Sequence, residues 1–277
     1  MRVISANKIT DTVAHLAVKA NHVLRPDVFN AIKKAHKKEK HPRAKKVLAA
    51  IVENATHAKK HKLAICQDTG IPVVFVEVGQ DVSIKGDLKA AINKGIHRGY
   101  NSGNLRHSIV KDPLSRGRPG HTPTVIHTDI VKGDKVRITV LPKGFGCENK
   151  TQLRMFNPTV GLDEIKQFII DAVKHAGADA CPPYFLGVGI GGTADYGSLM
   201  AKKALLHQGN YLKPFLVRKL ESELLREINK LNIGPMGLGG RTTALSVNVL
   251  TYPTHIAGFP VAVNISCHAL RSATAVI

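Results

Sequence analysis

Three cysteines occupy positions where a glycine- or proline-rich backbone could bring them to one point. Cys66 opens a Cys-Gln-Asp-Thr-Gly run, Cys181 precedes two prolines, and Cys267 precedes a histidine. A thiolate is a nucleophile and a soft metal ligand, so three together favour zinc or an iron–sulfur cluster over magnesium or calcium. With the Gln67 amide and the Asp68 carboxylate, they suggest a metal-centred active site with an open fourth ligand position. The alternative is buried, inert cysteines, because thiols are among the most often buried side chains.

The composition predicts a globular protein with reduced thiols. The chain has 277 residues, 43% of them hydrophobic, which is enough for one large domain or two small ones. Its four cysteines are too few for a disulfide framework. We find no apolar run approaching the roughly 20 residues that span a bilayer, and no signal-peptide core at the N-terminus. We therefore expect a cytoplasmic protein without a membrane partner.

The net charge of +20 invites a nucleic-acid interpretation, but its distribution weakens it. The densest cluster, residues 33–46, contains no aromatic residue, so a platform for base stacking is missing. A basic nucleic-acid-binding protein therefore remains a distant alternative. A solvated face, an acidic partner or the steering of an anionic substrate is the preferred explanation.

The order of the expected elements predicts an α+β fold, with an irregular, mixed α/β fold as the alternative. An N-terminal helical region covers about residues 1–62, with helical periodicity from residue 8, and is followed by a small β-sheet flanked by helices. Residues 124–131 and 135–141 predict two strands joined as a hairpin through a Lys-Gly-Asp turn. Further helices are expected at residues 87–98, 162–176, 199–207 and 214–231, and further strands at residues 73–78, 185–188, 245–250 and 261–265. We treat residues 1–277 as one domain.

Two glycine-rich segments imitate nucleotide-binding motifs. Gly187, Gly189 and Gly192 satisfy G-x-G-x-x-G, but the acidic residue expected about 20 positions later is absent. A tight glycine turn near a cysteine is the better interpretation. Residues 234–242 approach a P-loop, yet Gly240 stands where the phosphate-binding lysine should be. Neither segment predicts nucleotide hydrolysis.

Six motifs taken in order resemble the α subunit of a two-subunit class I iron–sulfur fumarate hydratase. The resemblance covers about residues 60–277, and the α subunit of L(+)-tartrate dehydratase is the close sibling. The motifs lie at residues 66–70, 105–108, 143–150, 180–192, 234–240 and 267–269.

The resemblance implies a [4Fe–4S] cluster held by Cys66, Cys181 and Cys267. The fourth iron would have no protein ligand and would act as a Lewis acid on a small dicarboxylate. The reaction implied is the reversible hydration of fumarate to (S)-malate, a step of the tricarboxylic acid cycle. Dehydration of L(+)-tartrate to oxaloacetate is the alternative, although residues 148–150 and 238–243 look more like those of a fumarase.

The same resemblance places five further residues at the substrate. Gln67 and Asp68 would face it, Arg106 would pair with a carboxylate, Gly146 would offer backbone N–H groups, and His255 would donate to another oxygen. Asp68 would assist proton transfer at the carbon next to a carboxylate, or hold the true base in place. From the residues alone, Asp68 is also a typical turn cap before Thr-Gly, and His255 a typical structural histidine.

The resemblance leaves the roles of two further residues open. Cys147 stands where fumarases usually have serine, and we expect it to be a passive small residue. Arg271 is either a cation near the cluster or an interface residue. Family members that are single polypeptides continue into a second domain, so the resemblance implies a separate β subunit, an active site between the subunits and an α2β2 assembly.

Overall fold

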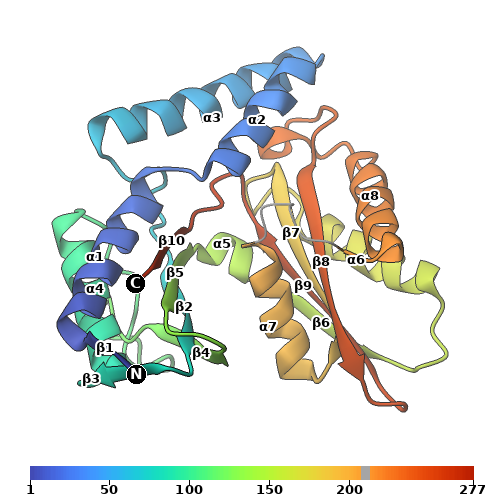
Figure 1. The fold of residues 1–277 in the computed structure, drawn as a ribbon. Helices are drawn as coiled ribbons and strands as arrows, with labels where there is room; N and C mark the ends of the chain where they lie inside the picture. Colours follow the sequence, from blue (N-terminus) through green and yellow to red (C-terminus); the bar gives the residue numbers. More distant parts are fainter. Residues whose placement is uncertain (207–212) are drawn as a thin grey trace. The chain divides into compact units, whose positions relative to one another are not determined.

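The structure is a computed structural model that describes residues 1–206 and 213–277. The chain divides into two compact units (Figure 1). The first unit comprises Met1–Arg25, Asn54–Phe145 and Arg271–Ile277, and the second comprises Pro26–Glu53 and Gly146–Leu270. Each unit combines helices with a four-stranded sheet, so the predicted α+β class is confirmed.

The sheet of the first unit has the strand order β10-β5-β2-β4. Strand β2 (Ile71–Gly79) runs parallel to β4 (Val125–Val131) and antiparallel to β5 (Val136–Lys143). Strand β10 (Ala273–Val276) pairs antiparallel with the other edge of β5. Strand β1 (Arg2–Ser5) pairs in parallel with β3 (Val82–Lys85). Strand β1 was not expected from the sequence.

The predicted hairpin is wrong, although both of its strands exist. Strands β4 and β5 do not pair with each other, because β2 lies between them. The reason is burial: β2 is almost wholly buried and gains most from two paired neighbours, whereas β4 is largely exposed and occupies an edge.

The core of the first unit lies between its sheet and two helices. Helix α1 (Ala6–His22) presents Val13 and Leu16, and helix α4 (Leu88–Ser102) presents Ile92 and Ile96. These side chains pack with residues of β2 and β5 in one buried cluster. Ser5 caps α1 and Asp87 caps α4 through side-chain oxygens that accept backbone N–H bonds.

The sheet of the second unit has the order β6-β9-β7-β8. Strand β7 (Tyr184–Gly192) is parallel to β8 (Ala244–Thr254) and antiparallel to β9 (Phe259–Ser266), which pairs with β6 (Gln152–Phe156). The remaining elements include α2 (Pro26–Lys38), α5 (Phe145–Glu148), α6 (Leu162–Ala176), α7 (Ala194–Ala204), α8 (Phe215–Asn229) and the 3₁₀ turn η1 (Pro235–Gly237). The predicted helices and strands of this unit are present, and residue 207, the last of one predicted helix, lies outside the described residues.

The N-terminal helical region is present as α1, α2 and α3 (Pro42–His61), but it does not form one compact unit. Helix α1 belongs to the first unit and α2 to the second, while α3 runs through the boundary between their sequence ranges. Among the described residues, no helix is both long and apolar enough to cross a membrane.

The G-x-G-x-x-G segment is part of a strand and not a tight turn. A Cβ atom on Gly187 would lie 2.0 Å from the Ala201 carbonyl oxygen, and one on Gly189 would lie 2.1 Å from the Gly197 carbonyl oxygen. Both acceptors belong to α7. These glycines therefore let α7 pack directly onto β7, and they do not form a phosphate-binding turn.

Candidate active site

The Cys66 motif is a loop of the first unit that leads into β2. Cys66 is half-buried, and its Sγ donates to the Gln67 Oε1 at 3.4 Å, while Gln67 is exposed. Gly70 has φ +71°, and a Cβ atom there would lie 2.7 Å from the carbonyl carbon and oxygen of Lys143. The loop therefore lies directly against the end of β5.

Asp68 joins this loop to the start of the glycine-rich segment at residues 143–150. Its Oδ1 accepts from the Gly70 N–H at 2.9 Å, and its Oδ2 accepts from the Phe145 N–H at 2.8 Å. This is the turn-capping arrangement that the sequence left open. A carboxylate has about four lone-pair sites, so two donors do not exhaust its capacity to accept a proton or a substrate hydrogen bond.

Two buried side chains that sequence analysis left open or missed hold the backbone of the loop. Arg271, 2% exposed, donates from Nη2 to the Asp68 carbonyl oxygen at 2.7 Å and from Nη1 to the Asn21 Oδ1 at 3.3 Å. The Tyr100 hydroxyl donates to the Thr69 carbonyl oxygen at 2.9 Å. Burial raises the pKa of Tyr100 and keeps it a neutral donor. Arg271 thus supports the motif from inside the first unit.

Arg106 is attached to the same loop through its backbone. Its carbonyl oxygen accepts from the Thr69 Oγ1 at 3.3 Å, and its side chain is exposed. The first unit therefore brings Gln67, Asp68 and Arg106 to one loop system. An exposed guanidinium beside a carboxylate-bearing loop can present two parallel donors to an anionic ligand.

A histidine cluster that sequence analysis missed lies beyond Arg106. The ring centroid of His121 is 3.8 Å from that of His107 and 5.7 Å from that of His97. His121 is 3% exposed, and within the described residues neither of its ring nitrogens has a hydrogen-bond partner. Burial first, and then the neighbouring His107, lower the pKa of His121. The charged form of His121 is thus disfavoured.

In the second unit, Cys181 and Cys267 lie at the same end of the sheet. Cys181 precedes β7, and Cys267 follows β9, which runs antiparallel to β7. His268 lies with Nδ1 3.1 Å from the Cys181 carbonyl oxygen, a contact in which the ring nitrogen donates. Both cysteines are half-buried. Cys181 has φ +56°, a conformation that places its side chain on a sharp turn.

Cys147 differs from the other three cysteines. It is 5% exposed and its Sγ donates to the Ala180 carbonyl oxygen at 3.4 Å.

Cys66, Cys181 and Cys267 are thiols on loops and are partly accessible. This donor set suits a soft metal centre. No group of three or more His, Cys, Asp or Glu side chains among residues 1–206 and 213–277 could hold a metal ion. Cys66 belongs to the first unit and Cys181 and Cys267 to the second, and thiolates are the donors that an iron–sulfur cluster takes.

Gly146 is exposed, and only the Asp179 carbonyl oxygen, at 4.0 Å, would approach a Cβ atom there. It lies in α5, which a polar network of the second unit anchors. The Glu148 carboxylate pairs with the Lys202 ammonium, and its Oε2 accepts from the Asn264 Nδ2 at 3.1 Å. The same Asn264 nitrogen donates to the Thr151 Oγ1 at 2.9 Å. Sequence analysis missed this network.

His255 lies at the opposite end of the sheet from Cys267. It is exposed in the turn that joins β8 to β9 (Figure 1). Its Nδ1 accepts from the Ala257 N–H at 3.1 Å. The eight residues of β9 separate this turn from Cys267, which is about 25 Å at the usual rise per residue. One chain therefore does not place His255 beside Cys267.

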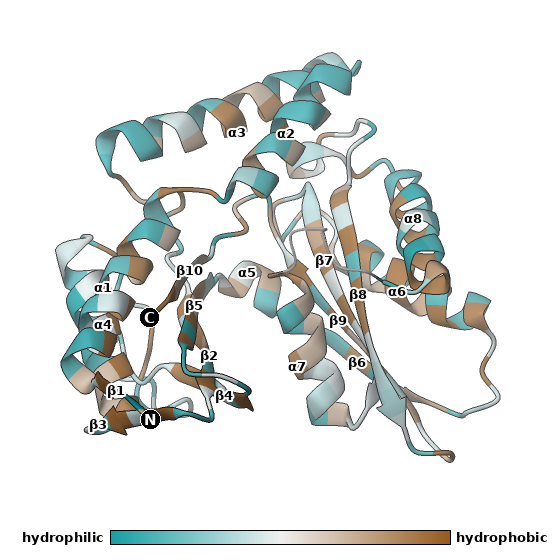
Figure 2. Cartoon of the chain, viewed as in Figure 1, coloured by the Kyte–Doolittle hydropathy of each residue, from teal (hydrophilic) through white to brown (hydrophobic). Residues whose placement is uncertain are grey.

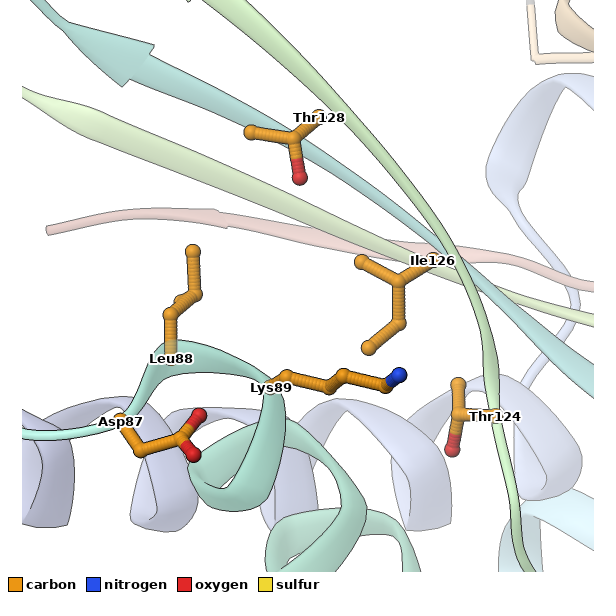
Figure 3. A pocket seen from close by; sticks show the side chains of 6 residues that line it. All are labelled: Asp87, Leu88, Lys89, Thr124, Ile126 and Thr128. Atoms are coloured by element: carbon orange, nitrogen blue, oxygen red, sulfur yellow. The ribbon is translucent and has the colours of Figure 1, made fainter.

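A pocket of the first unit contains none of the predicted site residues. Its cavity has a volume of about 550 Å³. It is lined by Asp87, Leu88 and Lys89 at the start of α4, and by Thr124, Ile126 and Thr128 in β4 or just before it. Figure 3 shows the Lys89 side chain extending along this pocket towards Thr124. The pocket has no thiol or arginine and is not part of the candidate site.

Comparison with known proteins gives a consistent result. The sequence model of the fumarate hydratase (Fumerase) family matches residues 10–276. A putative L(+)-tartrate dehydratase subunit alpha from Methanocaldococcus jannaschii is 37% identical over 274 residues, which cover 96% of each chain. The L(+)-tartrate dehydratase subunit alpha of Escherichia coli O157:H7 is 26% identical over 278 residues, covering 99% of this chain and 92% of that one. The protein of that name from Shigella sonnei gives the same identity and coverage.

Proposed function

Because the chain belongs to the fumarate hydratase family, we propose that it is the α subunit of a hydro-lyase that interconverts fumarate and (S)-malate. The observation that carries this proposal is the match of the family model over residues 10–276, which includes every candidate site residue. Dehydration of L(+)-tartrate to oxaloacetate is the second candidate, and the names of the full-length relatives favour it.

The proposed cofactor is a [4Fe–4S] cluster held by Cys66, Cys181 and Cys267. When bound, it supplies a Lewis acid for the hydroxyl and carboxylate oxygens of the substrate. The partly accessible thiols support this assignment, since a ligand must be reached by the metal during assembly. Cys147 is buried and is not assigned as a ligand.

The residues of the Asp68 loop bind and orient the substrate in this proposal. Arg106 pairs one carboxylate through two parallel hydrogen bonds, and the exposed Gln67 amide donates to a neighbouring oxygen. Asp68, fixed by two backbone donors, uses its remaining lone pairs to accept or orient the proton at the carbon next to the carboxylate. Gly146, without a side chain, leaves its N–H accessible.

We assign the active enzyme as an α2β2 assembly. The relatives are named as alpha subunits, which supports a separate β subunit. His255 lies too far along β9 to join Cys267 of its own chain, so a second α chain would supply it. Mixing His255→Ala chains with Cys267→Ser chains should then restore part of the activity that each variant lacks. Absence of any restoration would contradict this arrangement.

The main experiment compares both substrates in one preparation. The chain is co-purified with its β subunit without oxygen, and kcat/KM is measured for fumarate and for L(+)-tartrate. A larger value for fumarate supports the first candidate, and a larger value for tartrate supports the second. An iron-replete assembly that converts neither diacid would refute both.

A pair of arginine variants tests the substrate contact. Arg106→Ala should lower kcat/KM about 10- to 100-fold, as expected for loss of a charge-assisted pair of hydrogen bonds. Arg118→Ala removes the same charge from another exposed arginine and should leave kcat/KM nearly unchanged. Equal losses in both variants would show that Arg106 acts only through the general charge.

A further inference from the structure

A pocket of the second unit is lined mainly by cationic side chains. This basic pocket has a cavity of about 760 Å³ between the end of α2, the start of α3 and the segment after η1. In Figure 2 the ribbon is coloured mostly hydrophilic where α2 and α3 meet. The cations that line it outnumber its one carboxylate by five to one: Lys37, Lys38, Lys40, Lys45 and Arg241 against Glu39.

The carboxylate of Glu39 forms no ion pair with these cationic side chains in the described residues, because its oxygens accept backbone N–H bonds. Glu39 is 2% exposed, and its Oε1 accepts from the N–H groups of Lys40 and His41, both at 3.0 Å. Its Oε2 accepts from the Arg241 N–H at 3.0 Å and from the Thr242 Oγ1 at 3.5 Å. Glu39 therefore holds the backbone that forms the wall of the pocket, and its oxygens are not bound to the cationic side chains.

The glycine at position 240 is required for this wall. Gly240 has φ +104°, and a Cβ atom there would lie 2.6 Å from the Ala44 Cβ and 3.1 Å from the Glu39 Oε2. The segment that carries Arg241 is thus held directly against the corner between α2 and α3. The cations stand around a fixed cavity.

The five cations have no anionic partner of their own in the part of the chain that the structure describes. None of them forms an ion pair there, and all five are exposed. Lys45 also lies in the first turn of α3, which has no acidic residue, at the positive end of the helix dipole. Like charges around one cavity repel each other, so a bound anion would relieve the repulsion.

The volume and the charge of the basic pocket indicate which class of anion fits it. The volume lies within the range of small-molecule sites, about 300–1,000 Å³. A dicarboxylate brings only two charges to five cations, whereas each phosphate of a chain adds negative charge and several acceptor oxygens. No aromatic side chain lines the pocket, so nothing stacks on a base. We propose that the basic pocket binds a polyphosphate chain, either inorganic or as the phosphate arm of a nucleotide.

Calorimetric titration of the full chain tests this proposal, and its readout needs neither the β subunit nor a cluster. Inorganic tripolyphosphate, ATP, a single-stranded oligonucleotide and malonate are compared at about 50 mM salt. Tripolyphosphate should bind saturably, with one site per chain, and malonate should bind far more weakly. Similar affinity for ATP identifies the phosphate chain as the ligand, and tighter ATP binding identifies a nucleotide as its source. Absence of saturable binding, or tighter binding of the oligonucleotide, overturns the proposal.

Charge reversals locate the site. Lys45→Glu and Arg241→Glu should each weaken tripolyphosphate binding about tenfold or more. Lys46→Glu is the matched control, because it makes the same charge change on the neighbouring exposed residue of α3, which does not line the pocket. It should change the affinity by no more than about twofold at this salt. Equal weakening by Lys45→Glu and Lys46→Glu, in variants whose circular dichroism is unchanged, would mean diffuse attraction and would refute a defined site.

Discussion

Gly70→Ala should disrupt the Asp68 loop more than its small volume suggests. Gly70 has φ +71°, and its missing Cβ faces the Lys143 backbone, with the carbonyl carbon and oxygen at 2.7 Å and the nitrogen at 2.8 Å. An alanine in this backbone conformation costs about 1–2 kcal/mol by itself. The overlap with a neighbouring backbone adds about 1–3 kcal/mol, as overpacking does in a core. The total predicted loss of stability is about 2–5 kcal/mol.

Gly117→Ala measures the cost of an alanine at positive φ without the overlap with a neighbouring backbone. Gly117 also has φ +71°, but nothing lies within 4 Å of its Cβ position. It should therefore lose only about 1–2 kcal/mol. The change in unfolded-state entropy is the same in both variants and cancels from the comparison.

Urea denaturation of both variants, followed by circular dichroism, measures the difference. Gly70→Ala should also separate the loop from Phe145, whose N–H binds the Asp68 carboxylate, and so reduce activity beyond the loss of folded protein. Equal losses of stability in the two variants would refute the argument from the close approach to Lys143.

Three further variants test the support of the loop and the histidine cluster. Arg271→Met removes the donor to the Asp68 carbonyl and should destabilise the chain by about 2–3 kcal/mol in urea denaturation, with a loss below about 0.5 kcal/mol contradicting its role. Tyr100→Phe removes one buried donor and should cost about 1 kcal/mol in the same assay, whereas unchanged stability would show that water replaces the bond. Burial, and then His107, lower the pKa of His121, so the unfolded chain binds more protons, and stability should fall as the pH drops through about 6.5. His121→Phe should reduce this dependence in melting curves measured across that range, and an unchanged slope would assign it to other groups.

The sequence predicted the elements that depend on local patterns. The helix at residues 162–176 and the strands inside β7, β8 and β9 follow from apolar periodicity, and the structure confirms them. Strand pairing is not local. The turn at Lys132-Gly133-Asp134 fits a hairpin, yet β2, some fifty residues earlier in the chain, takes the place between the two strands because it is more apolar.

The candidate site likewise combines residues that the sequence brought to attention with long-range contacts that it did not predict. Residue type and local context drew attention to the cysteines, and the resemblance to the family's motifs drew attention to Asp68 and Arg106. The support of the site could not be predicted, because Arg271 reaches Asp68 across 203 residues and Asn264 reaches Glu148 across 116. Contacts between residues so far apart produce no periodic pattern in the sequence. The position of Arg271 four residues after Cys267 was the one available signal.

The iron and acid-labile sulfide content of anaerobically purified protein tests the central claim most directly. We predict about four of each per chain, strong loss in Cys181→Ser, and retention in Cys147→Ser, whose thiol is buried against Ala180. Absence of iron after anaerobic reconstitution, or equal loss in both variants, would contradict a cluster held by Cys66, Cys181 and Cys267.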